Sequence, residues 1–179
     1  DAETIGLSLD IYRKLGFKKA CVYVNDRDLL VDIPYKAIVV IDKLEKIGEM
    51  GVISEMIEKG IEREQAISYF KKVRELKPSE TILKIFEYLK SLGFDESWYK
   101  FVPTLSRSFS YSTGPIWEVK IEDFDQGSVL GGERYDKLIN KVAGVEIPGT
   151  GFGLGFDRTL EACRQFGLVP EISTVSKVL

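Results

Sequence analysis

The spacing of hydrophobic residues changes twice along this chain of 179 residues, and each change predicts a change in structure. Residues 2–16 carry apolar side chains at helical spacing, and residues 20–24 form a short apolar run typical of a buried strand. From residue 35 to residue 99 the spacing is helical only, in segments 36–47, 52–58, 64–76 and 82–92. We therefore expect a helical subdomain inserted between two parts of a strand-containing domain.

Strand-like alternation returns in the last third of the chain. Residues 107–112 and 116–121 alternate on either side of a Thr-Gly-Pro turn, which predicts an antiparallel pair. Residues 127–130 form a further short strand that the next two glycines break, and residues 135–144 follow with helical spacing. Successive antiparallel strands with helices laid across one face predict an α+β fold rather than a doubly wound parallel sheet.

The last predicted strand lies within residues 148–158, where glycine occupies every second position from 149 to 155. Successive strand side chains point to opposite faces, so one face carries apolar side chains and the other is bare. Two interpretations are open: a flat ligand lies on the bare face, or a neighbouring helix packs tightly there. Arg158 follows directly and opens a helical segment, where a guanidinium is well placed to hold a phosphate. The pattern is not the dinucleotide fingerprint, whose glycines lie in the turn between strand and helix.

Composition and charge narrow the possible functions. The chain is 44% hydrophobic and 30% charged, as expected of a globular domain, and its net charge is −3. Any nucleic-acid contact must therefore come from a local basic patch. The one candidate is Lys71, Lys72, Arg74 and Lys77, but glutamates are interspersed with it, so we favour a solvated helix face over an RNA contact.

The chain has no histidine and only two cysteines, Cys21 and Cys163. These residues are too few for a zinc site, so we expect no metal bound by the chain and two reduced, buried, structural thiols. Chemistry that needs an imidazole base is also excluded, whereas activation of a carboxylate by ATP needs none.

No apolar run approaches the length of a membrane span and no leader is visible, which predicts a cytoplasmic protein.

Three blocks together resemble class II aminoacyl-tRNA synthetases, and most closely the histidyl-tRNA synthetase family. Residues 105–119 (LSRSFSYSTGPIWEV) are similar to that family's first histidine signature, usually Arg-Gly-Leu-x-Tyr-Tyr-Thr-Gly. Residues 131–138 (GGERYDKL) resemble the second signature, and residues 148–158 resemble class II motif 3. Order and spacing agree over the whole chain, including a helical insertion before the first signature.

The resemblance implies a domain organisation. Residues 1–34 would begin the catalytic α+β domain, residues 35–99 would be the helical insertion, and residues 100–172 would complete the catalytic domain. Residues 173–179 would begin the first strand of an anticodon-binding domain. Since the family's motifs 1 and 2 lie upstream of Asp1, we expect the chain to be the second half of a catalytic domain, and to be inactive or nearly so alone.

The resemblance also assigns roles to residues. Arg107 would be the catalytic cation, neutralising the histidine carboxylate and the α-phosphate of ATP as the adenylate forms, although a strand-face ion pair with Glu118 is the simpler alternative. Arg158 would hold the γ-phosphate, with Gly155 beside it. The histidine pocket would further include Tyr111, Ser112, Tyr135, Gly151 and Gly153, although each tyrosine alone is typical of a core or rim aromatic.

Three residues depart from the family pattern. Ser112 replaces a tyrosine that helps to bind the imidazole, Ser108 stands where glycine is usual, and Glu133 stands where a third glycine is common. A serine hydroxyl can still bond a ring nitrogen, but it reaches less far. Adenylate chemistry is therefore better supported by the sequence than specificity for histidine.

The predicted function is ATP-dependent attachment of histidine to tRNA(His), with ATP bound together with Mg²⁺, by a protein that is a homodimer when intact. One alternative is the non-catalytic, histidine-sensing regulatory subunit of ATP phosphoribosyltransferase, which shares this fold. Arg158 and the long helical insertion count against that alternative. Another is a synthetase-like RNA-sensing module within a regulatory protein.

Overall fold

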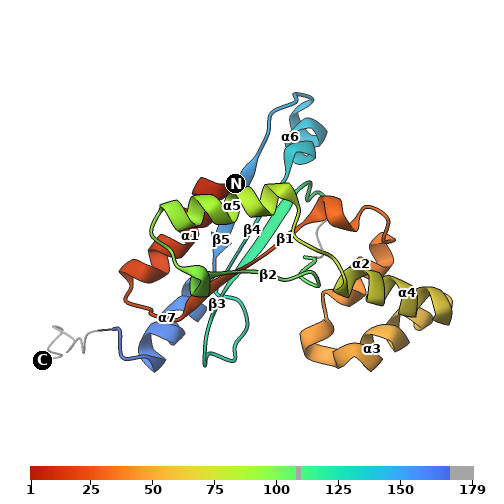
Figure 1. Cartoon of the computed structure of the whole chain (residues 1–179), viewed down its shortest axis with the longest axis horizontal. Coiled ribbons are helices and arrows are strands. Elements are labelled where there is room, and N and C mark those ends of the chain that lie inside the picture. Colours follow the sequence, from red (N-terminus) through yellow and green to blue (C-terminus); the bar gives the residue numbers. More distant parts are fainter. Residues whose placement is uncertain (108–109, 170–179) are drawn as a thin grey trace, which may run out of the picture.

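A computed structural model describes residues 1–107 and 110–169 and shows one five-stranded sheet flanked by helices (Figure 1). The strands follow the order β2-β1-β3-β4-β5. They are β1 Ala20–Asp26, β2 Tyr99–Phe101, β3 Pro115–Ile121, β4 Leu130–Arg134 and β5 Thr150–Leu154. β1 and β2 are parallel and the other three pairs are antiparallel. The predicted α+β fold with an antiparallel sheet is confirmed.

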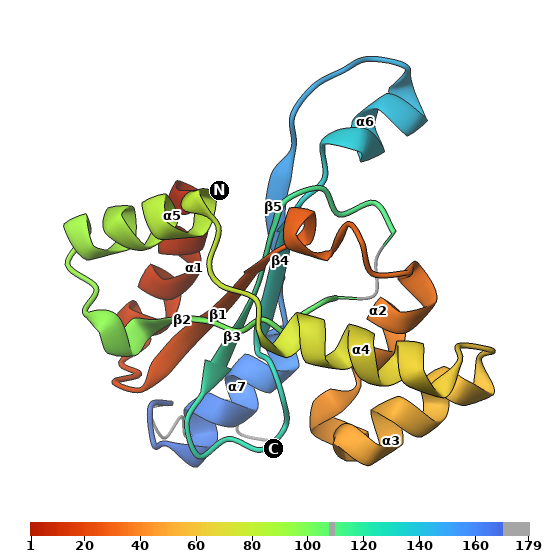
Figure 2. The same cartoon turned by 45° about the vertical axis from the view of Figure 1, so that its right-hand side comes forward.

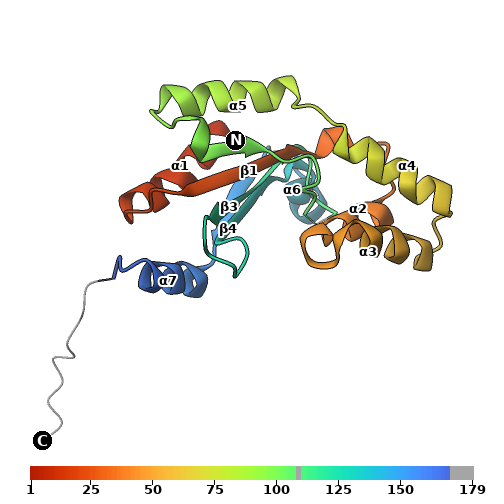
Figure 3. The same ribbon diagram turned by 60° about the horizontal axis from the view of Figure 1, so that its bottom comes forward.

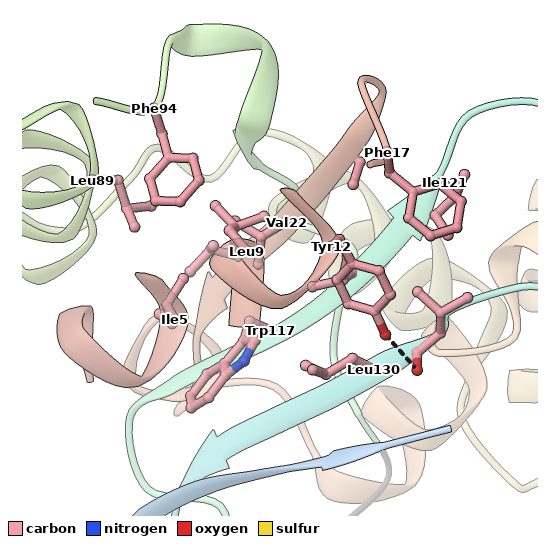
Figure 4. Packing of buried hydrophobic residues seen from close by; sticks show 14 of the residues in the cluster. Ile5, Leu9, Tyr12, Phe17, Val22, Leu89, Phe94, Trp117, Ile121 and Leu130 are labelled. Carbon is pink, nitrogen blue, oxygen red and sulfur yellow. Dashed lines mark hydrogen bonds between the residues drawn. The ribbon is translucent and has the colours of Figure 1, made fainter. Parts of the chain in front are cut away.

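The main hydrophobic core lies between the sheet and two helices, α1 Ala2–Lys14 and α5 Glu80–Ser91 (Figure 3). α1 buries Ile5, Leu9 and Tyr12, which recur at helical spacing and so share the face toward the sheet. Tyr12 also donates a hydrogen bond from its hydroxyl to the carbonyl of Val129, which satisfies the one polar atom of a buried ring (Figure 4). Helix α7 Phe156–Gln165 joins this core through Ala162 and Cys163.

A second hydrophobic core holds three other helices together, α2 Tyr35–Ile41, α3 Leu44–Glu58 and α4 Arg63–Arg74. These helices lie on the other side of the sheet from α1 and α5 (Figure 2). The predicted insertion also contained α5, but α5 packs against α1 in the main core. The domain boundaries at residues 34, 99 and 172 stay predictions, and we propose that the insertion ends before α5.

Two predictions about the strands were wrong. Arg107, Ser110, Tyr111 and Ser112 lie outside any strand, and Arg107 has φ +40°, which no strand residue adopts. The segment before them is fixed as a loop instead, because Asn25 donates to the carbonyls of Pro103 and Leu105. Residues 108–109 lie outside the described residues.

The second error concerns Gly131 and Gly132, which do not break a strand. Strand β4 begins only at Leu130, so residues 127–129 of the predicted strand lie outside it, and β4 then runs through both glycines. Each glycine leaves room for a side chain. A Cβ atom at Gly131 would overlap the guanidinium of Arg107, and one at Gly132 would overlap the indole of Trp117. Close packing against the indole therefore requires glycine at Gly132, whereas a side chain at Gly131 would displace the guanidinium of Arg107.

The end of the chain follows the prediction as far as it is described. Helix α6 Asp136–Ala143 ends at Gly144, whose φ of +69° is the left-handed conformation that glycine adopts most readily.

Both cysteines are free; Cys163 is buried, and Cys21 is half-buried rather than buried as expected. The strand predicted for residues 173–179 lies outside the described residues. Within residues 1–107 and 110–169, no helix has the length and apolar character needed to cross a membrane.

Candidate functional site

The alternating glycines of β5 form part of the wall of a cavity of about 550 Å³. The register pairs Gly153 with Gly131 and Gly151 with Glu133, so these residues of β4 and β5 share one face of the sheet. Phe152 and Leu154 pack against the hydrophobic core. The face predicted to be bare is thus the face that lines the cavity.

The glycines on this face do not all serve the same purpose. A Cβ atom at Gly149 or Gly151 would come within 2.6–2.8 Å of Tyr135, so these two make room for the tyrosine side chain. At Gly153 an added Cβ would meet no atom within 4 Å. Tight packing therefore explains Gly149 and Gly151, whereas Gly153 marks the open part of the cavity, where the ligand interpretation stays a prediction.

The space around Gly132 and Gly153 differs, and this predicts different effects of alanine on the stability of the protein at the two positions. Gly132→Ala should lower the free energy of unfolding by about 1–3 kcal/mol, because its methyl group overlaps Trp117. Gly153→Ala should leave stability unchanged or raise it by up to about 1 kcal/mol, because alanine restricts the unfolded chain. Urea unfolding of both variants measures the difference, and equal destabilisation would show that Gly153 is not open.

Arg107 enters the cavity wall from the loop before β3. Its side chain is 16% exposed, lies against Gly131, and forms ion pairs with Glu118 (Nη1 to Oε1, 3.3 Å) and Glu133 (Nε to Oε1, 3.9 Å). The ion pair with Glu118 that the sequence suggested as the simpler alternative is therefore present. Burial raises the pKa of Glu118, and the Arg107 charge opposes that rise. The guanidinium thus lies between two carboxylates, with a hydrogen bond from Nη1 to Glu118 and a longer ion pair to Glu133.

Glu133, which lies in strand β4, contacts both Arg107 and Ser112. The hydroxyl of Ser112 donates a hydrogen bond to Glu133 Oε2, and both residues are buried. Partial burial, and next the charge of Glu133, raise the pKa of Tyr111. Ser112 and Glu133 both depart from the family pattern, and the structure places them in contact with each other. Ser112 lies behind Glu133 and is not among the residues that line the cavity.

Arg158 lies in the first turn of α7, on the cavity rim. Its side chain is exposed, and its Nη1 donates a hydrogen bond to the carbonyl of Ser128 at 3.0 Å. Gly155, just before the helix, donates its N–H to the carbonyl of Val129 at 2.8 Å, which fixes where α7 begins. The site therefore has one partly buried arginine paired with carboxylates and one exposed arginine at its rim.

The structure brings most of the predicted site residues to one cavity. Its lining includes Arg107, Tyr111, Tyr135, Gly151, Gly153, Gly155 and Arg158. From the sequence, Glu133 was noted only as a departure from the second histidine signature. In the structure it is the one acidic residue, among the described residues, that lines this cavity. The position of this charged residue directly after two glycines was the feature of the sequence that could have indicated a site residue.

The basic side chains of residues 71–74 that the sequence suggested as an RNA contact are paired with acidic side chains in the structure. Lys72 pairs with Asp32 at 2.8 Å, Arg74 pairs with Glu49 at 3.0 Å, and Lys71 lies 3.9 Å from Glu75. These pairs are exposed and consist of alternating charges, which favours the solvated-face interpretation. An RNA contact here stays a weaker hypothesis.

Comparison with known proteins shows which sequences this chain resembles. No protein-family model matches it, but curated sequences do along its whole length. It is 30% identical to the histidine–tRNA ligase of Gloeobacter violaceus over 212 residues, covering 100% of this chain and 45% of the relative. It is 33% identical to the histidine–tRNA ligase of Aeropyrum pernix over 204 residues, covering 99% of this chain and 47% of the relative.

Solved structures show the same relationship at the level of the fold. Histidyl-tRNA synthetase from Nostoc sp. PCC 7120 matches 94% of this chain and 47% of its own with a TM-score of 0.79 at 21% identity. A Bacillus halodurans C structure described as an ATP phosphoribosyltransferase regulatory subunit/histidyl-tRNA synthetase matches 90% of this chain and 49% of its own, with a TM-score of 0.61 at 20% identity. The chain thus spans a little under half the length of these relatives. Its sequence and its fold together identify it as a homologue of the histidyl-tRNA synthetases, with the class II synthetase fold.

Proposed function

We propose that this chain forms part of the catalytic domain of a histidine–tRNA ligase, and that the cavity over Gly153 holds histidine and ATP while they react. In this reaction the histidine carboxylate attacks the α-phosphate and displaces pyrophosphate, and the resulting adenylate then transfers histidine to tRNA(His). The observation that carries the proposal is that two arginines and the bare glycine face line a single cavity. The relatives named histidine–tRNA ligase, aligned over the whole chain, support it.

Arg107 suits the reacting end of such a site. Negative charge is shared among carboxylate and phosphate oxygens during the displacement, and a planar guanidinium donates to both without giving up a proton. Glu118 and Glu133 hold it in place, so little reorganisation is needed when charge develops. We therefore assign Arg107 to the carboxylate and α-phosphate.

Arg158 suits the far end of the nucleotide. Its position in the first turn of α7 combines an exposed cation with the positive end of a helix dipole, which favours a phosphate group. Tyr111 and Tyr135 would flank the amino acid, and the open space at Gly153 would admit the substrate between them. We assign Arg158 to the γ-phosphate, with Gly155 beside it.

The proposed site needs more than this chain supplies. Among the described residues, no group of three or more Asp, Glu, His or Cys is arranged to hold a metal ion, so the chain offers cations to the nucleotide and Mg²⁺ would arrive on the ATP phosphates. The relatives are about twice as long as the chain. We expect the isolated chain to be inactive or nearly so, and the full-length protein to be a cytoplasmic homodimer.

A second candidate is a histidine-sensing regulatory subunit of ATP phosphoribosyltransferase. The Bacillus halodurans structure, whose description names such a subunit, favours it. A sensor would need the amino-acid pocket but not a γ-phosphate ligand. The position of Arg158 on the cavity rim therefore favours the ligase.

Amino-acid-dependent ATP–pyrophosphate exchange distinguishes the two functions. In the full-length protein that contains this chain, we expect exchange with histidine and with none of the other standard amino acids. Histidine binding without any exchange would instead support the sensor. Binding of uncharged tRNA without exchange would support an RNA-sensing module.

A further inference from the structure

Opposite charges lie side by side in the wall of the cavity. Glu133 is 6% exposed and projects from the cavity face of β4, paired across the sheet with Gly151, which has no side chain to cover it. Arg107 lies next to it, with Nε 3.9 Å from Glu133 Oε1. A buried carboxylate next to the cation that is assigned to the substrate carboxylate calls for a functional explanation.

The surroundings of Glu133 keep its charge directed at the cavity. Oε2 accepts the hydrogen bond from Ser112, which lies behind it, while Oε1 lies on the side of Arg107. Glu118 is the other carboxylate paired with Arg107, but it does not line this cavity. Within the described residues, Glu133 is thus the acidic group available to a ligand there.

An amino acid carries a carboxylate and at least one positively charged nitrogen. We propose that Glu133 helps to bind the amino-acid substrate by accepting an N–H from a positively charged nitrogen of the amino acid, while Arg107 binds the carboxylate. In histidine that nitrogen is either the α-ammonium or the protonated imidazole, and both have the same chemistry toward a carboxylate. This inference rests on the proposed function and adds a residue to its amino-acid pocket.

The test is Glu133→Gln in the full-length protein, since glutamine keeps the shape and the acceptor for Ser112 but removes the charge. A charge-assisted hydrogen bond is replaced by a neutral one, so KM for histidine in ATP–pyrophosphate exchange should rise about 10- to 100-fold. The value of kcat should fall as well, because Glu133 helps to hold Arg107, but by a smaller factor than the rise in KM. The matched control is Glu122→Gln, a surface glutamate paired with Lys19 at 3.0 Å, which should leave both constants unchanged.

3-(Imidazol-4-yl)propionate, which has hydrogen in place of the α-ammonium, distinguishes the two nitrogens when used as a competitive inhibitor. If Glu133 accepts from the α-ammonium, the inhibition constant of this analogue will be the same in wild type and Glu133→Gln. If it accepts from the imidazole, the inhibition constant will rise as much as KM for histidine.

A folded Glu133→Gln protein with the wild-type KM for histidine would overturn the inference. If that variant fails to fold, Glu133→Asp serves instead, since it keeps the charge but withdraws it by one methylene. Its KM should rise at least about fivefold, as expected for a weakened charged hydrogen bond, and an unchanged KM would again overturn the inference. If wild type shows no exchange with any amino acid, the proposed function fails; calorimetric titration of histidine into wild type and variant would still test Glu133.

Discussion

Replacing Arg107 with alanine should lower kcat for histidine-dependent ATP–pyrophosphate exchange about 10²- to 10³-fold in the full-length protein. A loss of this size is typical when one preorganised donor to the developing charge is removed. Arg107 is held by Glu118 and Glu133 before any substrate binds, so its contribution falls on the chemical step. Single-turnover measurement of adenylate formation separates this step from substrate binding.

Removal of Arg107 also leaves two partly buried carboxylates without their cation, so a folding defect has to be separated from a catalytic one. Arg107→Lys retains the charge without the planar fork and should recover only part of the rate. Arg13→Ala is the control, because Arg13 is an exposed arginine paired with Asp10 at 2.6 Å and lies away from the cavity. A folded Arg107→Ala protein that forms adenylate at the wild-type rate would refute the assigned role.

The largest effect on stability is expected for Trp117→Ala. Trp117 is fully buried in the main core, lies against Gly132, and its indole N–H points to Ser8 Oγ at 3.4 Å. Truncation of a buried aromatic of this size costs about 3–5 kcal/mol, and domains of this kind have about 5–15 kcal/mol in total. Urea unfolding should therefore show a large fall in the transition midpoint.

Trp98 provides the matched substitution. It is half-buried at the edge of the same core, where it packs against Phe94 with ring centroids 5.5 Å apart. Trp98→Ala should cost clearly less than Trp117→Ala, because less of its surface leaves water on folding. Similar losses for the two variants would mean that the contact between β3 and β4 at Trp117 and Gly132 is not central to the fold.

Regular patterns predicted much of this structure. The period-two glycines of residues 148–158 located β5 and its bare face, because side-chain alternation in a strand is a local property. The helical spacing of Ile5, Leu9 and Tyr12 located α1 for the same reason. These features depend only on residues that are close in sequence.

Features that depend on distant residues were missed. Residues 107–112 alternate like a strand, yet hydrogen bonds from Asn25, which is far away in sequence, hold the segment before them as a loop. Gly131 and Gly132 suggested a break in the strand because glycine is usual in turns, but here each makes room for a side chain from another segment. The contact between Ser112 and Glu133 likewise exists only in the folded chain.

The most direct test of the proposed site is a crystal structure of the full-length protein bound to a non-hydrolysable histidyl-adenylate analogue. We expect the histidyl group over Gly153, between Tyr111 and Tyr135, and the phosphate mimic within hydrogen-bonding distance of Arg107. An analogue bound elsewhere, with this cavity left empty, would contradict the central claim.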